Sequence, residues 1–215
     1  MRIVLLGAPG SGKGTQAALL QETYGIPHVS TGEILRTEVA GSTELGRKAE
    51  SYMNAGGLVP DDVILDMIGE RLRRPDARRG WILDGFPRTL VQARGLQELT
   101  DRIGQRVDVG VVLNVDAEVV VQRLTSRLEC ERCRTVTSVS EAHGNDCAKC
   151  GGKLVLRADD QPDIVRRRIA VFEQQTRPVF EFFRTHYHVV DVDASQPLER
   201  VTEALRVALE RYDHS

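Results

Sequence analysis

The chain has 215 residues, of which 41 % are hydrophobic and 28 % are charged. This length suits one ordinary domain with a substantial core and a small insertion, and the composition is typical of a soluble globular protein. The formal net charge of −2 excludes an overall basic surface suited to nucleic acid, so any anion binding has to come from local clusters of arginine.

The N-terminus reads MRIVLLGAPG, a positive residue followed by a short apolar run. The run over residues 3–6 is too short for the hydrophobic region of a signal peptide, and it leads directly into glycines and Lys13. No apolar run in the sequence approaches the roughly 18 residues needed to span a membrane. We therefore expect a cytoplasmic protein.

The first predicted elements are a buried strand over residues 3–6, a helix over 13–24 and an extended segment over 27–30. Ser30 and Glu33 have the capping-box spacing that starts a further helix. Pro60 and Asp61 can open another helix that runs to about residue 74.

Three more apolar strands follow, WILD at 81–84, DVGVVLNV at 108–115 and YHVVDV at 187–192. Helical patterns fill residues 89–100, 117–128, 162–185 and 197–212, with a kink or break expected near Pro178. Strands that alternate with helices predict an α/β domain whose parallel sheet is covered on both faces. Residues 30–60 and 128–158 leave this alternation, and we interpret both segments as insertions into one core.

The segment GAPGSGKGT, residues 7–15, nearly fits the phosphate-loop pattern G-x-x-x-x-G-K-[ST]. It matches at Gly7, Gly12 and Lys13, but Gly14 stands in the hydroxyl position and the hydroxyl comes one residue later, at Thr15. Glycines let backbone N–H groups approach phosphate, the helix N-terminus adds positive charge, and Lys13 can reach the outer phosphates. The alternative is a tight strand-to-helix turn with a surface lysine, which the dense glycines argue against.

The missing hydroxyl bears on magnesium, because the Ser or Thr of this pattern ordinarily ligates Mg²⁺. Another anchor is then needed. Asp84 qualifies, since it ends the buried strand at 81–84 as an acidic residue of the Walker-B type does. The alternative for Asp84 is a turn or cap aspartate before Gly85.

All four cysteines lie in one segment, where Cys130, Cys133, Cys147 and Cys150 form C-x₂-C-x₁₃-C-x₂-C. Two such pairs hold Zn²⁺ tetrahedrally, and a secreted disulfide framework would scatter its cysteines. Two disulfides or positions that no longer bind metal are the alternatives, and His143 lies between the pairs as a possible substitute ligand. We expect a structural zinc, which supplies folding energy to a segment with little core of its own.

The segments GAPGSGKGT, STGEILR, GGLVPDD and DGFPRT, with the arginines around the cysteines, resemble the adenylate kinases. The resemblance is to the bacterial type with a long, zinc-bearing lid, and it runs from residue 1 to about residue 197. It implies the reaction ATP + AMP ⇌ 2 ADP with Mg²⁺, and a monomer. It also implies a three-layer P-loop fold with a central parallel five-stranded sheet. The core would comprise residues 1–29, 60–125 and 161–215, the AMP-binding insertion 30–59 and the zinc-binding lid 126–160.

The resemblance further implies a set of site residues. Its ATP-binding positions are Gly10, Ser11, Gly12, Lys13, Gly14, Thr15, Arg123, Arg127, Val136, Thr137 and Gln196. Its AMP-binding positions are Thr31, Arg36, Gly57, Leu58, Val59, Gly85, Phe86, Pro87, Arg88, Gln92, Arg157 and Arg168. Its catalytic positions are Lys13, Asp84, Arg88, Arg127, Arg157 and Arg168, with Asp84 holding Mg²⁺ through water. Arginine suits this work because its planar fork binds phosphate oxygens in pairs, although each arginine has an alternative as a solvated helix charge.

Four positions depart from the family pattern. Glu33 stands where aspartate is usual, Leu128 replaces a second arginine after Arg127, an aromatic of the lid is replaced near residues 136–137, and Gln196 stands where lysine is frequent. We assign no catalysis to Glu33, whose capping role either carboxylate can fill.

Two other functions compete with this interpretation. One is a nucleoside monophosphate kinase for another base, such as UMP or CMP, or one that uses GTP as donor; the long lid and the STG at 30–32 favour AMP. The other is a zinc-ribbon module that binds nucleic acid, but the cysteine segment has mixed charge and no aromatic residue for base stacking. We expect the nucleotides ATP, AMP and ADP as partners, and neither nucleic acid nor a membrane.

Overall fold

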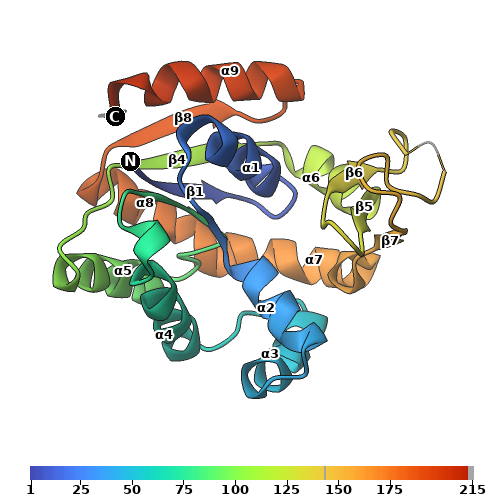
Figure 1. The fold of residues 1–215 in the computed structure, drawn as a ribbon, viewed down its shortest axis with the longest axis horizontal. Helices are drawn as coiled ribbons and strands as arrows, with labels where there is room; N and C mark the ends of the chain where they lie inside the picture. The colour runs from blue at the N-terminus through green and yellow to red at the C-terminus, as the bar shows by residue number, and fades with distance from the viewer. Residues whose placement is uncertain (143, 213–215) are drawn as a thin grey trace.

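The structure, a computed structural model, describes residues 1–142 and 144–212. Its largest sheet has five strands in the order β2–β3–β1–β4–β8, and every pair of neighbours is parallel (Figure 1). The strands are β1 (Arg2–Gly7), β2 (His28–Ser30), β3 (Trp81–Asp84), β4 (Val109–Asn114) and β8 (Val189–Asp193). The predicted parallel α/β architecture is therefore confirmed.

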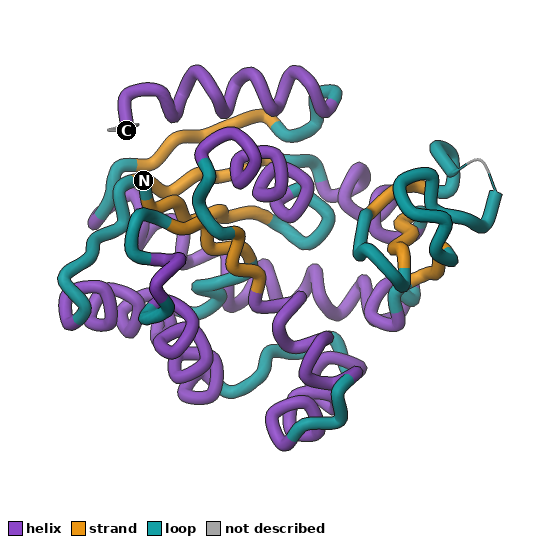
Figure 2. Tube along the Cα trace, viewed as in Figure 1, coloured by secondary structure: helices purple, strands orange, loops and turns teal. Residues whose placement is uncertain are grey.

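Helices cover both faces of this sheet because the side chains of each strand alternate between them. In β1, Ile3 and Leu5 pack into one buried cluster with α1 and α9, whereas Val4 and Leu6 join a second cluster with α4, α5 and α8. Figure 2 shows the resulting three layers. These helices are α1 (Lys13–Tyr24), α4 (Asp61–Leu72), α5 (Leu90–Arg102), α8 (Arg177–His186) and α9 (Leu198–Leu209).

The first predicted insertion is a pair of helices, α2 (Thr31–Ala40) and α3 (Glu44–Asn54). Ser30 caps α2 as expected, since its side chain accepts a hydrogen bond from the Glu33 N–H at 3.4 Å. The two helices approach closely at Gly46, where a Cβ atom would lie 2.1 Å from the Glu38 carbonyl oxygen. Only glycine fits this contact.

The second insertion forms a separate antiparallel sheet in the order β6–β5–β7. Its strands are β5 (Arg127–Cys130), β6 (Val136–Ser138) and β7 (Leu154–Leu156), at the right of Figure 1. The predicted helix over 117–128 is wrong at its end, because α6 (Ala117–Thr125) stops at Thr125. Leu128 pairs with both Thr137 and Leu156, so strand pairing overrides its helix propensity.

The long helical pattern after residue 161 is interrupted, as expected near Pro178. It consists of α7 (Pro162–Val171), a π-helical turn over Phe172–Thr176 and then α8. Short 3₁₀ turns are η1 (Pro75–Ala77), η2 (Ala158–Asp160) and η4 (Glu210–Tyr212). No helix in the described ranges combines the length and apolar character that crossing a membrane requires.

Candidate active site

The phosphate loop lies between β1 and α1, at the carboxyl end of the central strand. Gly10 and Gly12 have positive φ values of 80° and 91°, a conformation that glycine adopts without strain. Gly12 is the N-cap of α1 and has no side-chain cap. The loop therefore presents backbone N–H groups and a helix N-terminus, the arrangement that binds phosphate.

Lys13 folds back onto this loop. Its Nζ donates hydrogen bonds to the carbonyl oxygens of Gly7 and Ala8, both at 2.8 Å. Burial lowers the pKa of Lys13 to about 8, although the nearby charge of Asp84 opposes the shift. The ammonium group is thus satisfied by carbonyls that it can exchange for phosphate oxygens.

Asp84 ends β3, directly beside β1, where Leu5 is its partner in the register. Its Oδ2 lies 3.5 Å from the position that a Cβ on Gly14 would occupy and 3.2 Å from His28 Nε2. Burial raises the pKa of Asp84, but the hydrogen bond with His28 and the charge of Lys13 outweigh it, so the pKa stays below its ordinary value. A carboxylate is a donor that Mg²⁺ prefers, and this one lies where the sequence predicts the metal anchor.

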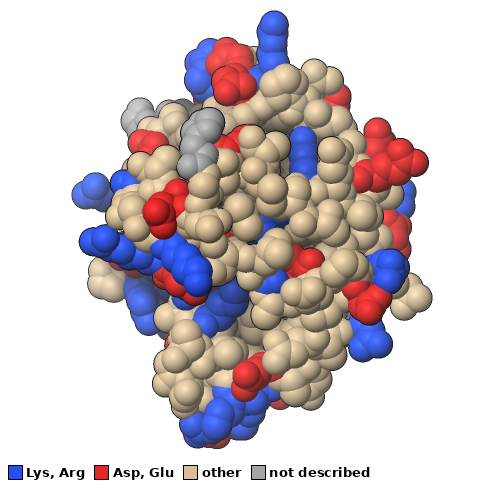
Figure 3. Space-filling model, turned by 90° about the vertical axis from the view of Figure 1, so that its right-hand side faces the viewer, with Lys and Arg blue, Asp and Glu red and all other residues tan. Residues whose placement is uncertain are grey.

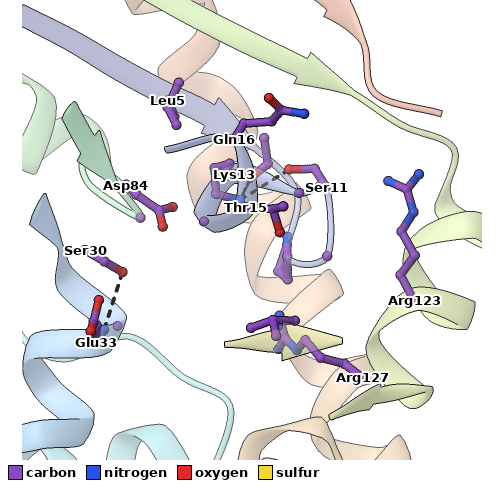
Figure 4. Close-up of a pocket in the computed structure, with 18 of the residues that line it drawn as sticks. Leu5, Ser11, Lys13, Thr15, Gln16, Ser30, Glu33, Asp84, Arg123 and Arg127 are labelled. Carbon is purple, nitrogen blue, oxygen red and sulfur yellow. Dashed lines mark hydrogen bonds between the residues drawn. The ribbon is translucent and has the colours of Figure 1, made fainter. Parts of the chain in front are cut away.

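One large cleft of about 1250 Å³ opens beside the phosphate loop. Every position that the sequence assigned to ATP or AMP lines it, from the core, from the α2–α3 pair and from the three-stranded sheet. Figure 4 shows Asp84 on one side of the loop, and Arg123 of α6 with Arg127 of β5 on the other. Arg123 donates to the Ala194 carbonyl at 2.9 Å.

The arginines of the cleft are held by carboxylates that sequence reasoning missed. Arg127 makes two hydrogen bonds to Asp160, at 2.7 and 2.6 Å, and Arg168 contacts the same carboxylate at 2.8 Å and Asp159 at 3.1 Å. The signal was available as the acidic pair DD at 159–160.

Arg157 is held in the same way, by Glu129 of β5. Burial, with the neighbouring charges of Arg127 and Arg36, lowers the pKa of Arg157 to about 10. So many cations close together favour an anionic ligand.

Residues predicted for AMP surround the Gly85 carbonyl oxygen. Thr31 Oγ1 donates to it at 2.8 Å and Arg88 Nε at 2.7 Å. Burial and the charge of Arg168 lower the pKa of Arg88. Gln92 lies one turn into α5, with its side chain beside the Arg88 backbone.

The four cysteines lie together and none is oxidised to a disulfide. All four Sγ atoms lie within 4.8 Å of one another, with Cys130 and Cys150 at 3.5 Å and Cys133 and Cys147 at 3.7 Å. Tetrahedral zinc with Zn–S bonds of about 2.3 Å separates its sulfurs by about 3.8 Å, so the cysteines fit this ion. The candidate ligand His143 lies outside the described residues.

Comparison with known proteins identifies the family of this chain. The family model described as adenylate kinase matches residues 5–188. The chain belongs to the adenylate kinase family. It is an ATP:AMP phosphotransferase, and the reaction that the sequence implied is confirmed by this membership.

Similar adenylate kinases match along their whole length. The chain is 44 % identical to the adenylate kinase of Archaeoglobus fulgidus, over 98 % of this chain and 99 % of the relative. It is 42 % identical to that of Streptomyces avermitilis, over 100 % of both chains, and 40 % identical to that of Agathobacter rectalis, over 95 % and 97 %. These matches therefore span nearly the whole of this chain and of each relative.

The face that carries the three-stranded sheet has mixed charge. In Figure 3, basic and acidic side chains are interspersed around it, with a broad uncharged area between them. Neighbouring opposite charges weaken the positive surface potential that binding to the phosphate backbone of a nucleic acid requires. The cleft, by contrast, is lined by more arginines than carboxylates.

Proposed function

We propose that this adenylate kinase binds ATP and AMP at the two ends of its cleft and closes over both. The observation that carries the proposal is the convergence of Lys13, Asp84 and arginines from distant segments on one cavity. We assign the core to residues 1–29, 60–125 and 161–215, the AMP-binding insertion to 30–59 and the lid to 126–160.

At the ATP end, the backbone N–H groups of residues 10–15 bind the phosphates, and Lys13 exchanges its carbonyl partners for phosphate oxygens. Arg123 lies against the base, and Val136, Thr137 and Gln196 complete the contact. At the AMP end, Thr31 and Arg36 bind the nucleotide, residues 57–59 and Gln92 the adenine, and residues 85–88 the phosphate.

Phosphoryl transfer needs two anions aligned and their charge offset, with little covalent chemistry from the protein. Arg88, Arg127, Arg157 and Arg168 supply that charge, and their planar forks fix the phosphate oxygens. Lid closure excludes water, which favours transfer to AMP over hydrolysis. When bound, Mg²⁺ neutralises phosphate charge, and Asp84 would hold it through water, beside the space that Gly14 leaves open.

The single experiment that tests this function is a coupled assay of ADP formation from ATP with AMP, against ATP alone. We expect strong dependence on AMP, and faster reaction with AMP than with UMP, CMP or any other acceptor. A rate that ignores AMP would indicate a simple ATPase, and a faster reaction with UMP or CMP would reassign the acceptor.

The cysteines support a structural zinc in the lid. Removing the ion with a chelator should lower the melting temperature and expose the lid to protease, because the described part of the lid has only a small apolar cluster around Cys130, Cys147 and Leu154. The fluorescence of Trp81, the one tryptophan and buried in β3, should stay unchanged at room temperature. Unchanged melting after verified metal removal would refute a stabilising metal.

We also propose a cytoplasmic monomer. The large exposed hydrophobic residues of the described chain are spread over α3, α5, α6, α9 and the lid, whereas stable homodimers bury one large apolar surface. Sedimentation equilibrium at micromolar concentration should give a mass of 23.9 kDa.

A further inference from the structure

Both polar atoms of the Gln92 side chain have partners inside the protein. Nε2 donates to Asp61 Oδ1 at 2.8 Å, and Oε1 accepts from the Arg88 backbone N–H at 2.8 Å. Gln92 is only 2 % exposed, so these two internal partners hold its side-chain amide.

These partners permit only one orientation of the amide. A carboxylate oxygen accepts and a backbone N–H donates, so Nε2 has to face Asp61 and Oε1 has to face Arg88. Turning the amide over would place oxygen against oxygen and N–H against N–H.

Asp61 is itself held in place. The same Oδ1 accepts from Thr89 Oγ1 at 3.0 Å, and Thr89 Oγ1 in turn accepts the Gln92 backbone N–H at 3.1 Å. Asp61 begins α4 and Thr89 caps α5, so two helix starts fix the geometry. Gln92 lines the cleft, and Asp61 is not among the described residues that do.

The fixed amide keeps one acceptor position on Oε1 and one N–H on Nε2. Adenine matches this pair, since its 6-amino group donates and an adjacent ring nitrogen accepts. A 6-oxopurine reverses the pattern: its O6 accepts, and the N1–H donates. In the same pose it would set O6 against Oε1 and N1–H against the N–H of Nε2.

We propose that Asp61 is a positioning residue that locks the Gln92 amide in the orientation selecting a 6-aminopurine monophosphate over a 6-oxopurine one. This inference rests on the proposed contact of Gln92 with the AMP base. Unpaired polar groups in a closed site discriminate strongly, and the lock keeps the amide from turning to suit the wrong base.

The test compares AMP with IMP, which differs at the 6-position and N1, in the variants Asp61→Asn and Asp62→Asn. Asparagine keeps the shape of the side chain but removes its negative charge and can turn either an oxygen or an N–H toward Gln92 Nε2, so the first variant weakens one of the two constraints on the amide. We expect the ratio of kcat/KM for AMP to that for IMP to fall about tenfold, as replacement of a charged hydrogen-bond acceptor by a neutral one predicts. KM for ATP should not change.

Asp62→Asn is the matched control, because Asp62 lies in the same first turn of α4 and is exposed. Its ratio should stay within about twofold of the unmodified enzyme. Equal ratios in the Asp61→Asn variant and the unmodified enzyme would overturn the proposal.

Gln92→Ala separates this proposal from the proposed role of Gln92. If Gln92 reads the base, this variant loses most of the AMP preference. If the preference for AMP over IMP survives in Gln92→Ala, the proposed contact between Gln92 and the base is wrong. If the preference is lost in Gln92→Ala but kept in Asp61→Asn, only the role of Asp61 is wrong.

A second measurement needs no variant and so does not depend on folding. In the unmodified protein, one proton of the Gln92 side-chain amide should be shifted downfield of the ordinary glutamine position and protected from exchange with solvent, because it is bonded to the Asp61 carboxylate. Ordinary chemical shifts for both protons, with rapid solvent exchange, would show that the side chain turns freely and would overturn the lock.

Discussion

Lys13 is bound by its own phosphate loop. Its ammonium is bonded to two carbonyl oxygens, and burial holds its pKa at about 8, well below that of a free lysine. Phosphate oxygens favour the charged form, so the pKa is higher in the ATP complex. Binding of ATP above pH 8 therefore takes up a proton.

The expected consequence is a pH-dependent affinity for a non-hydrolysable ATP analogue. Below pH 8 Lys13 is already charged, so it does not make the affinity depend on pH. Above pH 8 the affinity should fall, by up to about tenfold per pH unit. Titration calorimetry between pH 7 and 9.5 measures it. Lys13→Arg keeps the charge throughout this range and should remove the slope, and a flat profile in the unmodified enzyme would contradict the argument.

Among the elements, α2 and α3 depend on one close contact. A Cβ at Gly46 would overlap the backbone of Glu38, so Gly46→Ala has to push the helices apart. Overpacking of this kind costs about 1–3 kcal/mol, and we expect faster hydrogen exchange in both helices and a higher KM for AMP. KM for ATP should stay unchanged.

Glu50→Ala is the control: it changes α3 at an exposed position and leaves the contact between Gly46 and Glu38 intact. Its exchange rates and KM for AMP should match those of the unmodified enzyme. Identical exchange in the Gly46→Ala variant would show that the helix pair tolerates the extra atom.

The elements also show what the sequence can and cannot predict. The loop, the five strands and the cysteine pairs were predicted because each is a local pattern of residues. The end of α6 was wrong because Leu128 is drawn into a sheet by strands 8 to 28 residues further along. His28, Glu129 and Asp160 were missed for a similar reason: each binds a partner at least 28 residues away in the sequence. The acidic pair at 159–160 marks Asp160 as a candidate, but no local pattern names its partner Arg127.

At the scale of the whole molecule, Asp160 links the three-stranded sheet to α7. Its side chain is fully buried and contacts Arg127 of β5 and Arg168 of α7. Asp160→Asn removes the negative charge that lies between Arg127 and Arg168. Because breaking a buried ion pair leaves a buried charge without its partner, we expect the free energy of unfolding to fall by about 3 kcal/mol. Urea denaturation measures the change.

Asp163→Asn provides the comparison, since its ion pair with Arg166 is exposed. Surface pairs of this kind contribute about 1 kcal/mol or less, so its midpoint should move little. Equal urea midpoints for the two variants would mean that Asp160 does not hold the lid and core together.

Because α6 and α7 lie side by side, the segment between them can be replaced by a different one. These helices pack against each other, and the chain leaves the core at the end of the first and returns at the start of the second. A replacement needs only to span that short gap, and the three-stranded sheet makes its own hydrogen bonds. The lid is thus a graft site: a shorter hairpin without metal could be spliced between Thr125 and Pro162 without rerouting any strand of the core sheet.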